Sequence, residues 1–400
     1  MNDKTWRAAR LSRLGSSIFA EVAEWKREAV LAGTDVIDLS IGSPDLPPSE
    51  SVRRALGEAA QRADAYGYPG SRGSAAFLEQ AAEWLAFRFG IRIDPGDELV
   101  SLMGSQDGLG HLALALCDPG DIALVPDPGY PVYMAGLALA GVEPHPMPLR
   151  AENGFLPDLD AIPEAVWKRA KFMLLNFPSN PVSAVAGLEF FAKAVEAAKR
   201  HGVLIVHDLA YSELAFDGYR PPSILQVDGA KETAVEFHSL SKSFNMAGCR
   251  IGFLAGNRTA VAALRELKAN IDYGVFLPVQ EAAVTALKED MAGAGVKAAS
   301  VYERRRDVFL EALAAEGWRV KRPKATMFVW APLPPMRWEQ DIPWDSRRIS
   351  REMLSRSGVA VVPGDAFGAE GEGYVRIALV EREERLLEAA GRIGRFIRGE

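Results

Sequence analysis

Short hydrophobic runs separated by helix-like stretches dominate the middle of the chain. Runs of four or five apolar, β-rich residues occupy positions 99–103, 122–125, 172–175, 203–206, 234–237 and 251–255. Most are separated by stretches with apolar residues at helical spacing, such as 107–117, 131–141 and 187–201. Strands that alternate with helices predict a mostly parallel sheet, and continuously apolar strands predict that helices cover both of its faces.

The two ends of the chain follow different patterns. Residues 5–30 mix apolar and charged positions at helical spacing, and residues 36–42 read as a short extended segment. Further helices are predicted at 49–61 and 74–90. From about residue 280 the sequence becomes helical and rich in charge, and short strands follow near 327–330, 359–362 and 374–379.

These patterns predict an α/β fold with a large domain and a smaller α+β domain. Residues 46–285 are expected to form the large domain, with its central sheet flanked by helices, and residues 286–400 the small one. The N-terminal segment 1–45 is expected to pack on the small domain. The loop at 333–345, which has three prolines and two tryptophans, is long enough to suggest an active-site flap.

Composition and charge exclude several classes of function. The 400 residues carry a net charge of -7 and no polybasic block, which argues against nucleic acid as a main partner. Cys117 and Cys249 are too few for a disulfide framework and lack the spacing of a metal site, so no metal and a reducing, cytoplasmic location are expected. No apolar run of about 18 residues is present, so we expect no membrane association.

Polar residues follow the predicted strands, where parallel α/β sheets bind their ligands. Gly104, Ser105 and Gln106 lead into a helix and could form a phosphate-binding turn, although a plain turn with Ser105 as N-cap has the same pattern. Tyr130 lies between rigid prolines and could stack on a planar ring, or simply pack in its loop. Asn180 could donate to a phenolate oxygen, or merely belong to an Asn-Pro turn.

A buried carboxylate and a lysine complete the series of strand ends. Asp208 follows an apolar strand, where a carboxylate is costly unless it meets a cation such as a protonated pyridine nitrogen. Its neighbour His207 suggests a Ser-His-Asp triad, but adjacent strand residues point to opposite faces and no GxSxG motif exists. Lys242 lies among serines that include Ser239, eight residues before Arg250, which suits covalent catalysis on a phosphorylated cofactor. Alone, that lysine could equally be a solvated surface residue.

Taken together, these motifs resemble the class I/II aminotransferases, which are pyridoxal-phosphate enzymes of fold type I. The similarity covers nearly the whole chain and includes Ser239-Leu240-Ser241-Lys242, Gly248-Cys249-Arg250-Ile251-Gly252 and Val362-Pro363-Gly364-Asp365-Ala366-Phe367-Gly368. The resemblance implies that Lys242 forms the Schiff base with pyridoxal 5'-phosphate. It further implies roles for Ser105, Gln106, Ser239 and Arg250 at the phosphate, Tyr130 against the ring, Asp208 at the ring nitrogen, and Asn180 and Tyr211 at the ring oxygen O3′.

The resemblance also predicts substrate contacts and a partner. Arg376 is expected to grip the substrate α-carboxylate, with the backbone of Gly42 close by. Tyr68 is similar to a tyrosine that reaches the phosphate from a neighbouring subunit, which implies a homodimer. Arg72 and the loop at 333–345 are candidates for reading the substrate side chain.

Two departures from the family pattern stand out. The usual Asn-Pro-Thr-Gly reads Asn180-Pro181-Val182-Ser183, so this turn is expected to differ in shape. Cys249 stands where relatives often carry tryptophan. Within the family the motifs are most similar to bacterial alanine (glutamate–pyruvate) and LL-diaminopimelate aminotransferases, and residues 272–276 favour the alanine type.

The predicted activity is transfer of an amino group between an L-amino acid and a 2-oxoacid. Alanine, glutamate, aspartate or a diaminopimelate-like compound would be the donor, and pyruvate or 2-oxoglutarate the acceptor. A β-lyase acting on a cysteine-derived amino acid needs the same residues and stays open as an alternative. A ligand-sensing regulator with this fold would carry an added DNA-binding domain, for which the N-terminal segment is too short.

Overall fold

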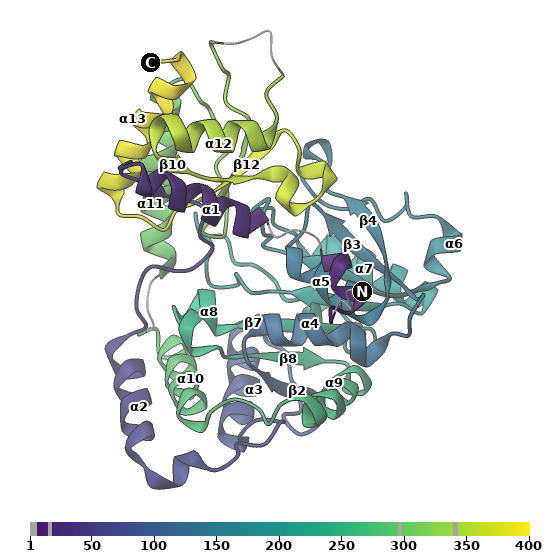
Figure 1. The fold of residues 1–400 in the computed structure, drawn as a ribbon. Helices are drawn as coiled ribbons and strands as arrows, with labels where there is room; N and C mark the ends of the chain where they lie inside the picture. Colours follow the sequence, from purple (N-terminus) through teal and green to yellow (C-terminus); the bar gives the residue numbers. More distant parts are fainter. Residues whose placement is uncertain (1–5, 15–17, 295–297, 339–342) are drawn as a thin grey trace, which may run out of the picture.

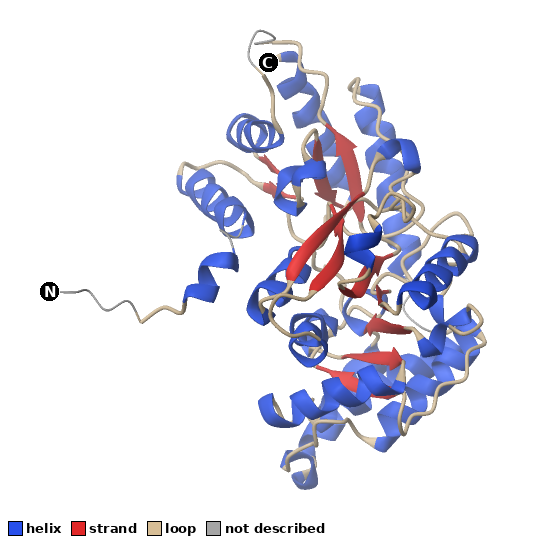
Figure 2. Ribbon diagram, turned by 90° about the vertical axis from the view of Figure 1, so that its right-hand side faces the viewer, coloured by secondary structure: helices blue, strands red, loops and turns tan. Residues whose placement is uncertain are grey.

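A seven-stranded sheet forms the centre of the molecule in the computed structural model, which describes residues 6–14, 18–294, 298–338 and 343–400. The strand order is β2-β8-β7-β6-β5-β3-β4. The strands are β2 (Leu99–Leu102), β3 (Ile122–Asp127), β4 (Glu143–Pro148), β5 (Ala170–Asn176), β6 (Leu204–Asp208), β7 (Ala234–Ser239) and β8 (Gly252–Gly256). Helices lie on both sides of the strands (Figure 2), as the sequence predicts.

Alternate residues of each strand enter two different hydrophobic clusters, one on each face of the sheet. On β5, Met173 and Leu175 join one cluster, while Phe172 and Leu174 join the other. The first face is covered by α3 (Ala75–Phe89), α7 (Leu188–His201) and α10 (Leu277–Met291), with α2 (Glu50–Gln61) packed on α10. The second is covered by α4 (Ser105–Leu116), α5 (Pro131–Ala140) and α9 (Arg258–Ile271) (Figure 1).

Two features of the sheet differ from the predicted pattern. Strand β4 escapes detection because its sequence contains three prolines and most of its residues are exposed, which only an edge strand tolerates. Strand β8 runs antiparallel to both of its neighbours. Its beginning, rather than its end, therefore lies beside the carboxyl ends of the parallel strands, and this brings Arg250 to their edge.

A second, smaller unit lies above the sheet in Figure 1. Strands β11 (Val362–Pro363), β12 (Tyr374–Ala378) and β9 (Phe328–Pro332) form an antiparallel sheet in that order. Around it lie α11 (Ala298–Ala315), α12 (Ser346–Ser357) and α13 (Glu383–Arg398). The short helices α6 (Glu164–Trp167) and α8 (Leu240–Ser243) belong to the lower part of the chain.

From residue 18 onward the N-terminal segment lies against this smaller unit, whereas its first helix, a 3₁₀ helix, packs on α5 beside the central sheet (Figure 1). The segment contains this 3₁₀ helix (Ala9–Leu14), α1 (Ile18–Leu31) and β1 (Ile37–Asp38), and β1 pairs in parallel with β10 (Val359–Ala360). Residues 1–5 and 15–17 of the predicted N-terminal helices, 295–297, and 339–342 of the predicted flap lie outside the described residues. The domain boundaries themselves stay a prediction.

Local sequence explains where several helices begin and end. The Asp345 side chain accepts a hydrogen bond from the Arg348 backbone N–H and so caps the start of α12. Gly358 ends the same helix in the left-handed conformation, with φ 70°, and Gly202 ends α7 in the same way with φ 67°. Among the helices of the described residues, none is long and apolar enough to cross a membrane.

Candidate functional site

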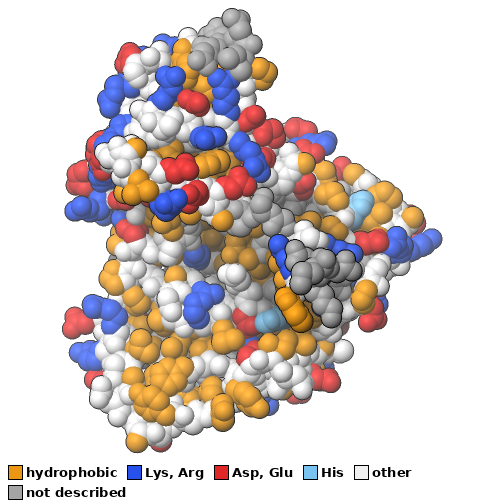
Figure 3. Space-filling model, in the orientation of Figure 1, with side chains coloured by type: hydrophobic (Ala, Val, Ile, Leu, Met, Phe, Trp, Pro, Cys, Tyr) orange, Lys and Arg blue, Asp and Glu red, His pale blue; other side chains and the backbone are white. Residues whose placement is uncertain are grey.

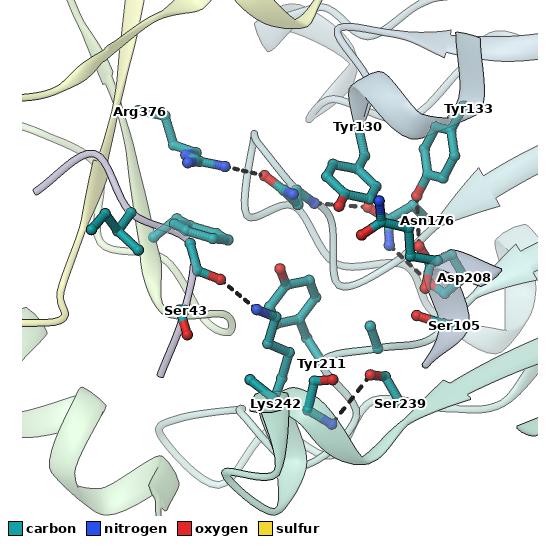
Figure 4. Close-up of a pocket in the computed structure, with 18 of the residues that line it drawn as sticks. Ser43, Ser105, Tyr130, Tyr133, Asn176, Asp208, Tyr211, Ser239, Lys242 and Arg376 are labelled. Atoms are coloured by element: carbon teal, nitrogen blue, oxygen red, sulfur yellow. Dashed lines mark hydrogen bonds between the residues drawn. The ribbon is translucent and has the colours of Figure 1, made fainter. Parts of the chain in front are cut away.

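A cavity of about 350 Å³ opens at the carboxyl edge of the parallel strands, beneath the smaller unit. It is lined by nearly all the residues that the sequence singled out. They are Gly42, Ser105, Gln106, Tyr130, Asn180, Asp208, Tyr211, Ser239, Lys242, Arg250 and Arg376. Asp208 and Arg376 lie on opposite sides of the cavity, with Tyr211 and Lys242 between them (Figure 4).

The Asp208 carboxylate is buried at the end of β6. Its Oδ2 accepts a hydrogen bond of 2.8 Å from the Tyr133 hydroxyl, while no described residue gives Oδ1 a partner. Burial raises the pKa of Asp208, and the hydrogen bond from Tyr133 opposes this shift. A buried carboxylate oxygen without a hydrogen-bond partner favours a cationic N–H donor, and a protonated pyridine nitrogen is such a donor.

Lys242 extends from α8 into the middle of the cavity. Its Nζ donates a hydrogen bond to the carbonyl oxygen of Gly42. Burial, with the nearby charges of Arg376 and Arg250, lowers the pKa of Lys242 to about 8. About a tenth of the amine is therefore neutral at pH 7, far more than for an ordinary lysine, and the neutral form is the one that a nucleophilic lysine requires.

A phosphate-sized cup lies beside Lys242, at the start of α4. Gly104 precedes the helix with φ 75°, and a Cβ there would come within 2.5 Å of Arg250 Nη2. The helix N-terminus, the Arg250 guanidinium and the hydroxyls of Ser239 and Ser241 converge on one edge of the cavity. Backbone N–H groups at a helix start, together with a fixed cation, are suited to a phosphate dianion.

Arg376 faces the cavity from β12. It is 2% exposed, its Nη1 donates to Asn180 Oδ1 at 2.9 Å, and its Nη2 donates to the Ser40 carbonyl oxygen at 3.0 Å. The guanidinium carbon lies 4.3 Å from the centroid of the Phe328 ring. Its Nε has no partner among the described residues, and burial lowers the pKa of Arg376 to about 10. A buried guanidinium without a carboxylate partner is suited to bind an anion.

Two tyrosines complete the ring-sized part of the cavity. Tyr130 lies immediately before α5, and Tyr211 follows β6 by three residues. The Tyr211 ring packs edge-on against Phe328, with centroids 5.9 Å apart. Burial raises the pKa of Tyr211, so its hydroxyl keeps its proton and can donate a hydrogen bond.

Several predicted residues do not line the cavity. Tyr68 is 86% exposed and lies against Tyr273, with ring centroids 4.8 Å apart. Arg72 is exposed and donates to the carbonyl oxygen of Gly96, so within this chain it cannot read a substrate side chain in the cavity.

The predicted flap is also placed elsewhere as far as the structure describes it. Trp338 and Trp344 pack edge-on against each other and on Phe396 of α13, and Trp338 Nε1 donates to the Phe396 carbonyl oxygen at 2.7 Å. The described tryptophans therefore serve the core of the smaller unit, because two large rings find their apolar surface there.

The sequence missed three side chains that shape the site. The Tyr133 hydroxyl donates to the Asp208 carboxylate, and Asn176 Nδ2 donates to the Asp208 carbonyl oxygen at 2.8 Å. The ring of Phe328 packs against the Arg376 guanidinium. The position of Tyr133 three residues after Tyr130 places both rings on one side of α5, a spacing that could have identified it. His207 points away from Asp208 and bonds Glu236, which confirms that no Ser-His-Asp triad exists here.

The donors and acceptors of the cavity fit one phosphorylated pyridine aldehyde. Asp208 matches a ring nitrogen, the cup at α4 matches a phosphate, and Lys242, which lines the same cavity, is suited to be the nucleophile. With the mostly parallel sheet and the smaller unit above it, this site defines a pyridoxal-phosphate enzyme of fold type I.

Comparison with known proteins leads to the same class. The family model described as aminotransferase class I and II matches residues 34–393. An LL-diaminopimelate aminotransferase of Desulforudis audaxviator is 46% identical over 386 residues, which cover 96% of each chain. A structure described as a probable N-succinyldiaminopimelate aminotransferase from Thermus thermophilus is 42% identical, with a TM-score of 0.87 over 94% of this chain and 99% of that one. The substrate-bound structure of BacF from Bacillus subtilis is 37% identical, with a TM-score of 0.92 over 98% of each chain.

The chain therefore belongs to the class I and II aminotransferase family. It is an aminotransferase that uses pyridoxal 5'-phosphate and acts on small-molecule amino acids and 2-oxoacids. Both diaminopimelate relatives are named as aminotransferases, so they give the β-lyase alternative no support. They also favour the diaminopimelate subgroup over the alanine type towards which residues 272–276 pointed.

Proposed function

We propose that the amino donor has the diaminopimelate skeleton and that a 2-oxoacid, pyruvate or 2-oxoglutarate, is the acceptor. The observation that carries this proposal is the 46% identity, over 96% of each chain, to a protein named LL-diaminopimelate aminotransferase. A second relative, named for an N-succinylated diaminopimelate, shares 42% identity. Both names contain the same seven-carbon diamino dicarboxylate skeleton.

The charges of the cavity support a donor whose far end is electrically neutral. Among the described residues, the lysine and arginine side chains that line the cavity are Lys242, Arg250 and Arg376. If Arg250 binds phosphate and Arg376 the α-carboxylate, no described arginine that lines the cavity remains for a second carboxylate, so 2-oxoglutarate as acceptor would need a cation from the neighbouring subunit. The far end of diaminopimelate carries an ammonium beside its carboxylate, so it needs polar partners but no net counter-charge.

We further propose roles for the residues of the site. When bound, pyridoxal phosphate supplies an electrophilic carbon and an electron-withdrawing ring. Asp208 keeps the ring nitrogen protonated, Asn180 and Tyr211 face the ring oxygen, and Tyr130 stacks on the ring. Ser105, Gln106, Ser239 and Arg250 hold the phosphate.

Lys242 and Arg376 act on the substrate itself. Arg376 fixes the α-carboxylate, with Gly42 beside it, and so orients the bond from Cα to hydrogen. A Cβ at Gly42 would lie 3.7 Å from Arg376 Nη2, so glycine leaves room for the carboxylate at this position. Lys242 Nζ, with its lowered pKa, would accept the Cα proton and deliver it to C4′, the cofactor carbon on the other side of the amino nitrogen.

The working unit is proposed to be a homodimer in the cytoplasm. Tyr66, Tyr68, Tyr273 and Phe276 are exposed aromatic residues, and their rings form two contacts, Tyr66 with Phe276 and Tyr68 with Tyr273. Hydrophobic side chains also gather on the lower part of the face seen in Figure 3, where α2 and α10 lie. Rings of this kind are typical of a subunit contact, from which Tyr68 would reach the phosphate of the neighbouring site.

A panel of amino donors tests the substrate proposal. Purified holoenzyme is incubated with LL-diaminopimelate or aspartate and either pyruvate or 2-oxoglutarate, with alanine and 2-oxoglutarate, or with glutamate and pyruvate. The new amino acid is measured in each case. We expect the highest kcat/KM with the diaminopimelate donor. A higher value with alanine would contradict the proposal, and pyruvate with ammonia from a single amino acid would indicate elimination.

A further inference from the structure

The departure at Ser183 leads to a hydroxyl pair that joins the two parts of the molecule. Ser183 lies in the turn that follows Asn180, and Thr326 lies just before β9 in the smaller unit. Their hydroxyl oxygens are 2.7 Å apart, and both residues are buried. The contact spans 143 residues of sequence.

Both backbones take a conformation that their side chains disfavour. Ser183 has φ 56° and Thr326 has φ 74°, each in the left-handed region. For a β-branched residue such as threonine this conformation is an outlier, and such outliers persist only where surrounding contacts hold them. Glycine is the default residue at such a position. Serine at 183 therefore provides a hydroxyl but leaves the backbone in a strained conformation.

The hydrogen atoms of the pair can all be accounted for. Ser183 Oγ donates to the Phe328 carbonyl oxygen at 3.0 Å, and the Phe328 N–H donates to Thr326 Oγ1 at 3.1 Å. The Ser183 proton is thus used, so the Thr326 hydroxyl donates to Ser183 Oγ. The three bonds form a closed ring around the backbone of Phe328.

Phe328 in turn contacts the residues that bind substrate. Its ring lies under the Arg376 guanidinium at 4.3 Å, packs edge-on against Tyr211, and would lie 3.3 Å from a Cβ at Gly42. Phe328 faces Ala378 across β9 and β12, and Arg376 is the next residue but one on the same side of β12. A shift of the Phe328 backbone therefore moves the surface on which Arg376 lies.

We propose that the hydroxyls of Ser183 and Thr326 are a positioning pair that fixes Phe328 and, through it, the carboxylate-binding geometry of Arg376. The inference rests on the proposed role of Arg376 in binding the substrate carboxylate. The same turn touches Arg376 directly through Asn180 Oδ1, so Ser183 and Asn180 together align the turn with β9 and β12. Neither hydroxyl lines the cavity, so the pair acts through Phe328 rather than on the substrate.

Matched variants of the holoenzyme test the pair. Thr326→Val removes the hydroxyl at nearly constant shape, whereas Thr326→Ser retains it. We expect Thr326→Val to raise both the KM for the amino donor and the inhibition constant of propionate, an unreactive carboxylate, by about tenfold, because a buried partner loses its hydrogen bond. Thr326→Ser should stay within about twofold of the wild type in both quantities. The dissociation constant of pyridoxal phosphate should change little in either variant.

Two variants of Ser183 distinguish the effect of its hydroxyl from the effect of its backbone conformation. Ser183→Ala and Ser183→Gly both remove the hydroxyl, but only glycine suits φ 56°. We expect the same rise in the propionate constant for both, and a smaller than additive effect when either is combined with Thr326→Val. An unchanged propionate constant in Thr326→Val and Ser183→Ala would overturn the proposal, as would a loss of thermal stability alone.

A separate variant tests the role on which this inference depends. Arg376→Gln should weaken propionate binding more strongly than any change to the pair. If Arg376→Gln leaves the propionate constant unchanged, the proposed role of Arg376 is wrong. If it weakens propionate while the hydroxyl variants do not, the role of Arg376 stands and the positioning pair does not.

Discussion

Lys242 illustrates how a single side chain takes its chemistry from its surroundings. The nearby guanidinium groups of Arg376 and Arg250 add to burial in lowering its pKa to about 8, from 10.5 for an ordinary lysine. The charged amine is disfavoured in the folded protein, so the folded state holds fewer protons than the unfolded state between these pH values. The stability of the cofactor-free protein should therefore rise as the pH increases through this window.

The same pKa predicts how fast the cofactor attaches. Only the neutral amine attacks the aldehyde, so the rate of covalent attachment to cofactor-free protein should rise through pH 8 and level off above it. Stopped-flow absorbance after mixing with pyridoxal phosphate measures this rate. Arg376→Gln removes one of the two cations and should move the midpoint to higher pH. A rate that still rises steeply towards pH 10.5 would contradict the lowered pKa.

Tyr133 provides a second prediction at the scale of single residues. Tyr133→Phe removes the hydrogen bond to Asp208 Oδ2 and leaves that carboxylate less stable in its charged form. We expect cofactor affinity to fall about tenfold, as measured by absorbance titration. Tyr219→Phe is the matched control, because the Tyr219 hydroxyl donates to the Ala186 carbonyl oxygen and does not line the cavity. Equal losses in both variants would mean that Tyr133 acts on stability alone.

The sequence identified the charged and aromatic residues that line the site but missed the residues that pack against them or hydrogen-bond to them. Asp208 and Lys242 are recognisable because charge at the end of an apolar strand is costly without a partner. Tyr133 and Phe328 look like ordinary core residues, since each lies at an apolar position of its own element. Their roles depend on contacts across the chain, which local spacing does not contain.

At the scale of elements, short continuous apolar runs separated by helix-like stretches carried most of the prediction. Neighbouring residues of such a run face opposite sides of the sheet, so an apolar run implies helices on both faces, as the two clusters show. Strand β4 was missed because three prolines give its edge position a loop-like sequence. The direction of β8 could not be predicted, because a period of two is the same in parallel and antiparallel strands.

Strands β6 and β7 are joined beneath the site by a buried acid–histidine cluster. Glu236 accepts hydrogen bonds from His207 Nδ1 and His238 Nε2, each at 2.8 Å, and from Ser223 Oγ at 2.6 Å. Burial opposes ionisation, but the two histidine hydrogen bonds outweigh it and lower the pKa of Glu236. His207 Nε2 also lies 3.1 Å from the Phe177 carbonyl oxygen, so both nitrogens of this ring lie beside oxygen atoms.

Glu236→Gln should destabilise the protein strongly. It removes a buried carboxylate that accepts hydrogen bonds from two histidines and a serine, and breaking such a network costs about 3–5 kcal/mol. Because the pKa of Glu236 is lowered by folding, its contribution is present above the ordinary value of 4.5 and fades as the pH falls below it. Denaturant unfolding followed by circular dichroism measures the loss, which should shrink in acid. Glu189→Gln, at an exposed pair with Lys193, is the control and should cost less than about 1 kcal/mol.

At the scale of the whole molecule, the exposed loop around Tyr68 suggests how two copies meet. Gly274 lies so close to this loop that a Cβ there would come within 2.2 Å of the Gly70 carbonyl oxygen. The loop is thus fixed on its own subunit while its tyrosine remains 86% exposed. If this side chain has the predicted role at a phosphate, it would act in the site of a second subunit of the proposed homodimer. The sequence of one chain predicts a role for the tyrosine but not the geometry of the contact between two subunits.

Complementation between two defective variants tests this arrangement. In a mixed dimer of Lys242→Ala and Tyr68→Ala subunits, one site combines Lys242 of the second subunit with Tyr68 of the first and is intact, and the other site carries both defects. With random pairing half the dimers are mixed, so about a quarter of wild-type activity should return. Differently tagged subunits allow the mixed dimers to be isolated and assayed. Lys242→Ala with Asp208→Ala is the control, because both residues serve the same subunit's site and no intact site can form. Isolated mixed dimers of the first pair that stay as inactive as the control would show that Tyr68 does not cross to the neighbouring site.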